Sequence, residues 1–124
     1  MYKEEKTLEE RKNESNRMKE RFPTRIACIV EKRNANIQSI DKRKFMSPSD
    51  LTLAQFTFVI RKRLKLNPSE AIFIFINNQL AVGSKTIGDM YTSHKDEDGF
   101  LYFTYDFENT FGYESFIFVE KNKI

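Results

Sequence analysis

The sequence has few of the residues that build disulfides and metal centres. Its 124 residues include one cysteine, Cys28, and one histidine, His94. A single cysteine cannot form an intramolecular disulfide, and these two side chains cannot supply the ligand cluster of a structural zinc site. We therefore expect no metal or other cofactor, and a reducing, cytosolic setting fits best.

Long apolar runs and catalytic constellations are lacking as well. The longest apolar stretch, residues 71–76, is far shorter than the roughly 20 residues that a bilayer-spanning helix needs. Residues 1–22 carry charges of both signs without an apolar segment, so we expect no secretory signal peptide. No pairing of a nucleophile with a base is evident, and we do not expect an enzyme.

What is present is a chain of one-domain length with an uneven charge distribution. The net charge is +3, yet residues 26–65 carry nine basic and three acidic side chains, while residues 66–112 carry two and seven. A basic cluster attracts acidic peptides, anionic lipid or nucleic acid through the same screened Coulomb interaction. Charge alone therefore does not choose the partner.

Local signals predict the elements of the first half. Residues 3–21 are rich in Glu, Lys and Arg and lack Pro and Gly, which predicts one or two surface helices. Residues 25–31 favour a strand, and we expect a second strand at 37–41 that continues towards Met46. Thr52 and Gln55 stand at capping-box spacing before a helix with an apolar face.

The second half alternates apolar runs with turn signals. Residues 71–76 predict a strand, and the following Asn77-Asn78 suits a tight hairpin turn with positive φ. Residues 86–94 predict a short helix and residues 100–105 a last strand.

The order helix, helix, β, β, α, β, β, short α, β predicts an α+β fold. It matches the ubiquitin-like β-grasp, a mixed sheet wrapped over one main helix, with an N-terminal helical extension. We divide the chain into this extension at 1–23, a core at 24–112 and a C-terminal tail at 113–124.

Over residues 2–112 the sequence resembles the autophagy-related protein 8 family of ubiquitin-like modifiers, which contains the GABA-receptor-associated protein and the microtubule-associated light chain. The blocks that carry the resemblance are YKEE, IVEK, DKRKFMSPSDLT, QFTFVIRKRLKL, AIFIFINN, DEDGFLYFTY and ENTFG. Several unrelated blocks in the same order are a far more specific signal than one short block.

The resemblance implies a covalent modification of Gly112, which follows Phe111. In the family a cysteine protease trims the chain after this glycine, and E1-like and E2-like enzymes then join it to phosphatidylethanolamine. A residue without a side chain lets the carboxylate enter narrow active-site clefts. The tail at 113–124 is longer than is usual in the family, and we expect its removal. Its alternating stretch at 115–119 leaves an extra strand open as the alternative.

The resemblance also implies that an extended peptide docks on the exposed sheet edge at residues 42–46. Such peptides carry an aromatic residue and, three positions later, an aliphatic one. The implied aromatic pocket consists of Glu14, Met18, Ile29, Lys44, Met46 and Phe100. The implied aliphatic pocket consists of Phe45, Pro48, Leu51, Phe56, Val59 and Ile60. Acidic residues beside the motif would meet Arg25, Lys42, Lys44 and Arg63.

A few of these positions need separate expectations. Phe56 and Ile60 lie on the apolar face of the predicted helix and should be core under any function. Ala27 and Cys28 stand where the family commonly has Pro and Val, so we expect a wider aromatic pocket on that wall. Met18 and Met46 replace branched aliphatic residues and should let the pocket adapt. We expect Cys28 to be packed, and His94 to lie at a surface helix end.

Together these inferences predict a non-enzymatic modifier in the cytoplasm and on the autophagosome membrane. Its implied partners are the processing protease, the E1-like and E2-like enzymes, receptors and adaptors with short linear motifs, and the membrane through the covalent lipid. One alternative is an unconjugated ubiquitin-like adaptor with a structural tail. The other is a basic nucleic-acid-binding module, which would show a steep salt dependence; we expect no specific nucleic acid.

Overall fold

The computed structural model describes residues 1–81 and 83–107, so Phe111, Gly112 and the tail lie outside the described residues. The elements are α1 (Tyr2–Glu5), α2 (Leu8–Arg21), β1 (Arg25–Lys32), β2 (Lys44–Pro48), α3 (Leu53–Leu64), β3 (Ile72–Ile76), β4 (Gln79–Leu80), α4 (Ile87–His94) and β5 (Leu101–Phe107). This order is the one predicted from the sequence.

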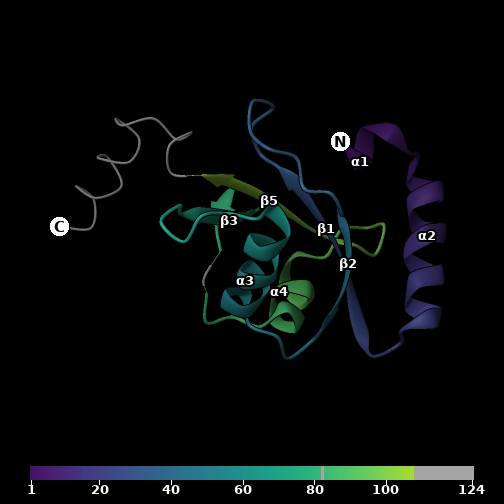
Figure 1. Ribbon diagram of the computed structural model, residues 1–124. Helices are drawn as coiled ribbons and strands as arrows, with labels where there is room; N and C mark the ends of the chain where they lie inside the picture. Colours follow the sequence, from purple (N-terminus) through teal and green to yellow (C-terminus); the bar gives the residue numbers. More distant parts are fainter. Residues whose placement is uncertain (82, 108–124) are drawn as a thin grey trace.

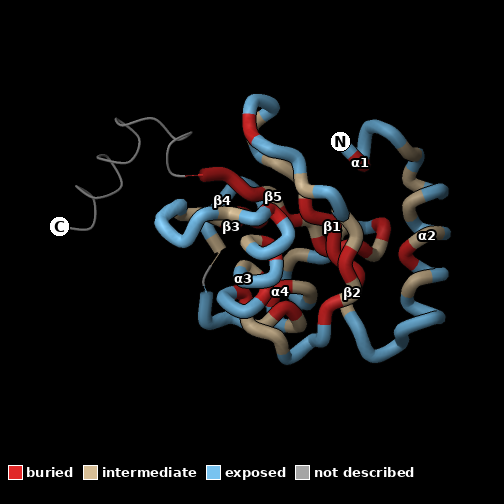
Figure 2. Tube along the Cα trace, in the orientation of Figure 1, coloured by how far each residue is buried: buried red, intermediate tan, exposed pale blue. Residues whose placement is uncertain are grey.

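The strands form one mixed sheet in the order β2-β1-β5-β3-β4. The central strands β1 and β5 are parallel, and the other pairs are antiparallel. Helices α3 and α4 cover one face, while α1 and α2 lie on the other side of β1 and β2 (Figure 1). The buried residues concentrate along the sheet and the inner side of α3 and α4, whereas α2 is mostly exposed (Figure 2).

Two apolar clusters hold these layers together. The larger one lies between the sheet and α3 with α4, and includes Phe56, Ile60 and Phe103. The smaller one lies under α1 and α2, and consists of Tyr2, Ala27, Ile29 and Phe100, with Met18, Met46 and Tyr102 packed against it. The sheet is therefore apolar on both faces near β1.

The helix cap, the core face of α3 and the hairpin turn that the sequence predicts are all present. The Thr52 hydroxyl accepts from the Gln55 amide at 3.2 Å, and the Gln55 side chain accepts from the Thr52 amide at 3.0 Å. Phe56 and Ile60 are buried on the inner face of α3, which confirms their expected core position. Asn77 and Asn78 have φ values of 50° and 62° and form the turn between β3 and β4.

The strand predicted at 37–41 is wrong, because this segment is irregular and β2 begins only at Lys44. Its carbonyl groups are taken by side chains instead of a strand ladder. The Tyr105 hydroxyl donates to the Gln38 carbonyl at 2.6 Å, and the Lys32 ammonium group donates to the Ala35 and Ile37 carbonyls. The sheet edge is thus Lys44–Pro48, and Lys42 precedes it.

Cys28 and His94 occupy contrasting positions. Cys28 is fully buried, as expected, and this burial raises the pKa of its thiol. His94 is the last residue of α4, but its ring is partly buried and the Nδ1 atom has no hydrogen-bond partner. Across residues 1–81 and 83–107, no three His, Cys, Asp or Glu side chains are grouped so that they could hold a metal ion. The helices described here are all too short or too polar to cross a bilayer.

Candidate functional site

The edge strand β2 is the feature around which the predicted site residues gather. In the described part of the chain it pairs with β1 alone, so its other side faces no strand. An edge strand presents unpaired N–H and C=O groups on which an extended peptide can be added. The candidate site is therefore the free edge of Lys44–Pro48 with the apolar groups above and below it.

Strand alternation sends neighbouring β2 residues to opposite faces of the sheet. Met46 stands opposite Ala27 and belongs to the cluster under α2. Phe45 stands opposite Cys28 and belongs to the cluster under α3. One strand therefore borders two separate apolar sites, one on each face.

The face under α2 brings together the predicted aromatic-pocket residues. Ile29 and Phe100 are fully buried and form its base. Met18 and Met46 are partly buried and pack against this base from α2 and β2. The thioether side chains thus supply the accessible, adaptable part of the pocket wall.

A polar group made of Glu14, Lys44 and Tyr2 lies beside this pocket. The Glu14 carboxylate accepts hydrogen bonds from the Lys44 ammonium group and from the Tyr2 hydroxyl. Partial burial raises the pKa of Glu14, but the hydrogen bonds from Lys44 and Tyr2 outweigh it, and the net pKa lies below the usual value. Burial, followed by the bond to Glu14, raises the pKa of the Tyr2 phenol. Glu14 is therefore an anion that ties α2 to the edge strand.

The face under α3 divides the predicted aliphatic pocket into core and surface residues. Phe45, Phe56 and Ile60 are buried, and the rings of Phe45 and Phe56 meet edge to face with centroids 5.9 Å apart. The surface residues are Leu51, which is partly buried against the core, and the exposed Pro48 and Val59. A ligand on this face would therefore contact mainly Leu51, Pro48 and Val59.

The four predicted cations differ in what they already bind. Arg63 pairs with Asp41 at 3.0 Å, and Lys44 pairs with Glu14. Arg25 is exposed and donates to the Met46 carbonyl at 3.3 Å. Lys42 stands over the Phe45 ring, with its ammonium nitrogen 5.1 Å from the centroid. Of the four, Arg25 and Lys42 have no carboxylate partner within the described residues.

Of the two residues that were expected to widen the aromatic pocket, only Ala27 lies on that side of the sheet. Cys28 faces the α3 side and belongs to the larger cluster, so the prediction that it widens the pocket is wrong. Ala27 faces the α2 side and lines a hollow of about 340 Å³ between α2 and the start of β1. The small side chain of Ala27 leaves this space beside the pocket.

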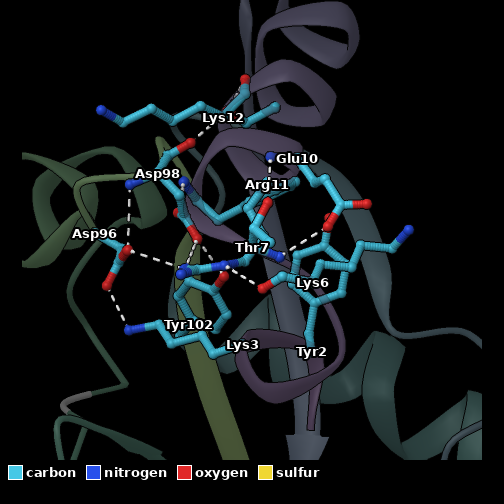
Figure 3. Close-up of polar contacts among 12 residues, drawn as sticks. Tyr2, Lys3, Lys6, Thr7, Glu10, Arg11, Lys12, Asp96, Asp98 and Tyr102 are labelled. Carbon is cyan, nitrogen blue, oxygen red and sulfur yellow. Dashed lines mark hydrogen bonds and ion pairs between the residues drawn. The ribbon is translucent and has the colours of Figure 1, made fainter.

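Sequence reasoning missed Tyr2 and the polar network that docks the N-terminal helices (Figure 3). The Tyr2 ring is fully buried and meets Phe100 edge to face with centroids 5.5 Å apart. Arg11 donates to the Asp98 carboxylate at 2.7 Å, and the Tyr102 hydroxyl donates to the same group. Residues 95–99 include three acidic side chains followed by a glycine, but no local signal in the sequence links them to residues near the N-terminus.

Gly99 allows α2 to approach this turn closely. Its φ is +91°, and a Cβ atom built on it would stand 2.7 Å from the Ser15 hydroxyl. That hydroxyl donates to the Asp98 carbonyl from within α2. A side chain at position 99 would therefore be strained by the backbone and would displace the Ser15 hydroxyl from its bond to the Asp98 carbonyl.

Comparisons with known proteins agree with this architecture. The family described as "Autophagy protein Atg8 ubiquitin like" matches residues 10–112. Autophagy-related protein 8 of Candida glabrata is 50% identical over 114 residues, which cover 91% of this chain and 97% of that protein. The Schizosaccharomyces pombe protein of the same name is 51% identical over 112 residues, which cover 90% and 93%.

Two solved structures extend the comparison. Trypanosoma brucei ATG8 has a TM-score of 0.81 at 42% identity, covering 86% of this chain and 93% of that chain. Plasmodium falciparum Atg8, in complex with a Plasmodium falciparum Atg3 peptide, has a TM-score of 0.77 at 28% identity, covering 86% and 94%. These matches confirm the resemblance and the ubiquitin-like fold, and this chain belongs to the Atg8 family of ubiquitin-like autophagy proteins.

Proposed function

We propose that this protein is a non-enzymatic modifier that is joined through Gly112 to phosphatidylethanolamine and docks autophagy receptors and adaptors on the free edge of β2. The observation that carries the docking half is the position of β2 between two apolar clusters on opposite faces of the sheet. The lipid would place the protein on the autophagosome membrane, and the unconjugated form would remain in the cytoplasm.

The geometry of an added strand supports a motif with anchors three residues apart. A peptide paired with β2 continues the alternation of the sheet, so its successive side chains point to opposite faces. Residues three positions apart therefore also point to opposite faces. An aromatic residue would reach the cluster under α2, and the aliphatic residue would reach Leu51 and Val59 on the α3 side.

The expected affinity follows from a short balance of contributions. Two apolar anchors contribute about 1.5 to 3 kcal/mol each. A few strand hydrogen bonds add about 1 kcal/mol each, and association costs several kcal/mol. The balance corresponds to a dissociation constant of roughly micromolar size. Exposed cations such as Arg25 would adjust this value by well under about 1 kcal/mol each.

The proposed partners follow from family membership. The Plasmodium relative was solved with an Atg3 peptide, which supports a conjugation enzyme of the E2-like class as a partner here. A cysteine processing protease and an E1-like enzyme would act before it, and receptors and adaptors with short linear motifs would bind afterwards. The two acyl chains of the conjugated lipid would hold the protein stably, where one chain would be marginal.

The conjugation half of the proposal is supported by where the family match stops. The match covers residues 10–112 and therefore ends at Gly112. The last described strand, β5, ends at Phe107, five residues before that glycine. Removal of residues 113–124 would expose the Gly112 carboxylate for transfer to the lipid amine. An unconjugated adaptor that keeps the tail is the alternative.

Docking is tested by truncating one accessible anchor contact on each face. Met46→Ala and Leu51→Ala should each weaken a labelled aromatic-x-x-aliphatic peptide by about tenfold, measured by fluorescence anisotropy, because each removes most of an apolar contact. Leu80→Ala is the matched control, since Leu80 is 50% exposed on β4 at the opposite edge. Phe45→Ala is less suitable because Phe45 is buried against Phe56. Unchanged peptide affinity in the Met46/Leu51 double variant would contradict peptide docking at the free edge of β2.

A further inference from the structure

The outer face of α3 carries aromatic and basic side chains that the proposed peptide docking does not use. This α3 patch consists of Phe58, Arg61, Lys62, Lys65, Leu66 and Pro68, which line an open hollow of about 390 Å³. Phe58 is 58% exposed, the largest fraction for a large apolar side chain in the described part of the protein. A single exposed apolar side chain is common on protein surfaces, so Phe58 points to a partner only together with the basic side chains around it.

The charge of the α3 patch has one sign. The Lys62 ammonium nitrogen lies 4.9 Å from the Phe58 ring centroid, and Arg61 donates to the Glu70 and Asn67 carbonyls at 2.6 and 3.1 Å. Lys62 and Lys65 form no ion pair with any residue in 1–81 or 83–107. A partner of this surface must therefore offer negative charge together with an apolar environment for one ring.

The α3 patch also lies towards the end of the sheet from which β5 departs. The loop 65–71 leads from α3 into β3, and Ile72 at the start of β3 pairs with Phe107 at the end of β5. Figure 1 shows this loop and the end of β5 at the same end of the sheet. Gly112 follows Phe107 by five residues, which span at most about 17 Å. A lipid attached to Gly112 would keep a bilayer within reach of the α3 patch.

We propose that the α3 patch is a second, reversible membrane contact that binds anionic lipid. Phe58 enters the interface between headgroups and acyl chains, and Lys62 and Lys65 meet the anionic headgroups. This inference rests on the proposed lipid attachment, which brings the bilayer to this end of the sheet. Val59, the residue after Phe58, belongs to the predicted aliphatic pocket, but no residue of the α3 patch does. An acidic protein would satisfy the charge, but it would not explain the position beside the lipid-bearing end.

The lack of tryptophan in the sequence gives a clean optical test. The full chain with Phe58→Trp and a C-terminal hexahistidine is anchored to phosphatidylcholine vesicles that contain a nickel-chelating lipid. On vesicles with about 30% phosphatidylserine added, we expect a blue shift of the tryptophan emission and quenching by brominated acyl chains. On vesicles without phosphatidylserine the spectrum should stay that of a solvent-exposed ring.

Two further variants make the test specific. Phe22→Trp is the matched control, because Phe22 is 42% exposed and stands near Arg21 and Arg25, but at the C-terminal end of α2. It should show no shift. Adding Lys62→Gln and Lys65→Gln to Phe58→Trp should lower the insertion constant about 25-fold, since each lysine near an anionic surface corresponds to about fivefold.

The outcomes separate this inference from the proposed function. An unshifted spectrum on anionic vesicles, or an equal shift in Phe22→Trp, overturns the α3 patch as a membrane contact. A shift with polyglutamate but not with vesicles also overturns it and assigns the surface to an acidic protein. Because the chelating lipid supplies the attachment, these results do not depend on conjugation at Gly112. Failure of lipid conjugation in cells would count against the proposed function alone.

Discussion

The Tyr2 side chain fastens the N-terminal helices to the sheet. Its ring fills the cluster under α1, with Phe100 on one side and the Arg43 guanidinium 5.0 Å away on another. Its backbone amide donates to Glu31 at 2.8 Å, and its hydroxyl donates to Glu14. The residue therefore joins α1, α2 and β1, and it supports the wall of the aromatic pocket from behind.

Truncation of Tyr2 should be costly for stability. Tyr2→Ala should lower the free energy of unfolding by about 3 to 5 kcal/mol, as for other buried aromatic residues. Tyr2→Phe should cost less, about 1.5 to 3 kcal/mol, because it keeps the packing and removes one hydrogen bond to a charged group. Urea unfolding measures both. The exposed Phe58→Ala should change stability by less than about 0.5 kcal/mol, and an equally small effect of Tyr2→Ala would show that α1 does not stabilise the fold.

The helix α2 is held to the sheet mainly by polar contacts. Ser15 is its only buried residue among the described ones, so α2 offers little apolar area. Arg11 bonds Asp98 and lies 3.7 Å from Asp96, and Glu14 bonds Lys44. On the neighbouring α1, Lys3 bonds Asp96. Ion pairs therefore hold α2 to the sheet, whereas α1 is also anchored by the buried Tyr2 ring.

Acid should release the N-terminal helices before it unfolds the α3 side. Burial raises the pKa of Asp96, but the hydrogen bonds that its carboxylate accepts from Lys3 and from the Asp98 amide lower the pKa by more. The net pKa of Asp96 is therefore lowered, and the same holds for Glu14. A carboxyl group with a lowered folded-state pKa stabilises the protein above its unfolded value of about 4. That stability is lost as pH falls through the folded-state pKa.

The measurement is urea unfolding between about pH 7 and pH 3 for the wild type and for Glu14→Gln with Asp96→Asn. The free energy of unfolding of the wild type should fall steadily below about pH 5. The double variant should be less stable at about pH 7 and should lose less free energy of unfolding between about pH 7 and pH 3. Asp50, an exposed residue before α3, provides the control substitution Asp50→Asn. Parallel curves for wild type and double variant would contradict this origin of the acid sensitivity.

At the scale of the whole molecule, the sheet order separates the proposed docking edge from the end of the sheet that leads to Gly112. β2 lies at one edge, while β5 pairs through its last residue with β3 on the far side. A peptide on β2 would therefore add to the side of the sheet away from β3. Under the proposed function, this arrangement lets the protein hold a receptor and remain on the membrane.

Conjugation through Gly112 is tested by intact mass of the protein recovered from its own cells. The wild type should lose residues 113–124 and gain the mass of phosphatidylethanolamine. Gly112→Ala should keep the fold and block both changes, because a Cβ atom obstructs the approach to the carbonyl group. A chain that ends at Gly112 should accept the lipid without the protease. If the family's processing protease left the wild-type mass unchanged, the adaptor with a structural tail would become the better interpretation.

The sequence alone determined the elements whose signals are local. Thr52 and Gln55 lie three residues apart and cap α3 by themselves, and Asn77-Asn78 turns the chain without help from distant residues. The element order and the core face of α3 followed from such signals, and the quoted sequence blocks were sufficient to identify the family.

The tertiary structure decided what depends on partners far along the chain. Arg11 and Asp98 are 87 residues apart, and no periodicity links them. Strand alternation places Ala27 and Cys28 on opposite faces, but only the packing showed that Ala27 lies on the α2 side and Cys28 on the α3 side. The sequence predicts a strand at residues 37–41, but Tyr105 and Lys32 bond the carbonyls of Gln38 and Ile37, and the segment is irregular. Local propensities are set by neighbours in sequence, whereas these contacts exist only after distant segments have packed together.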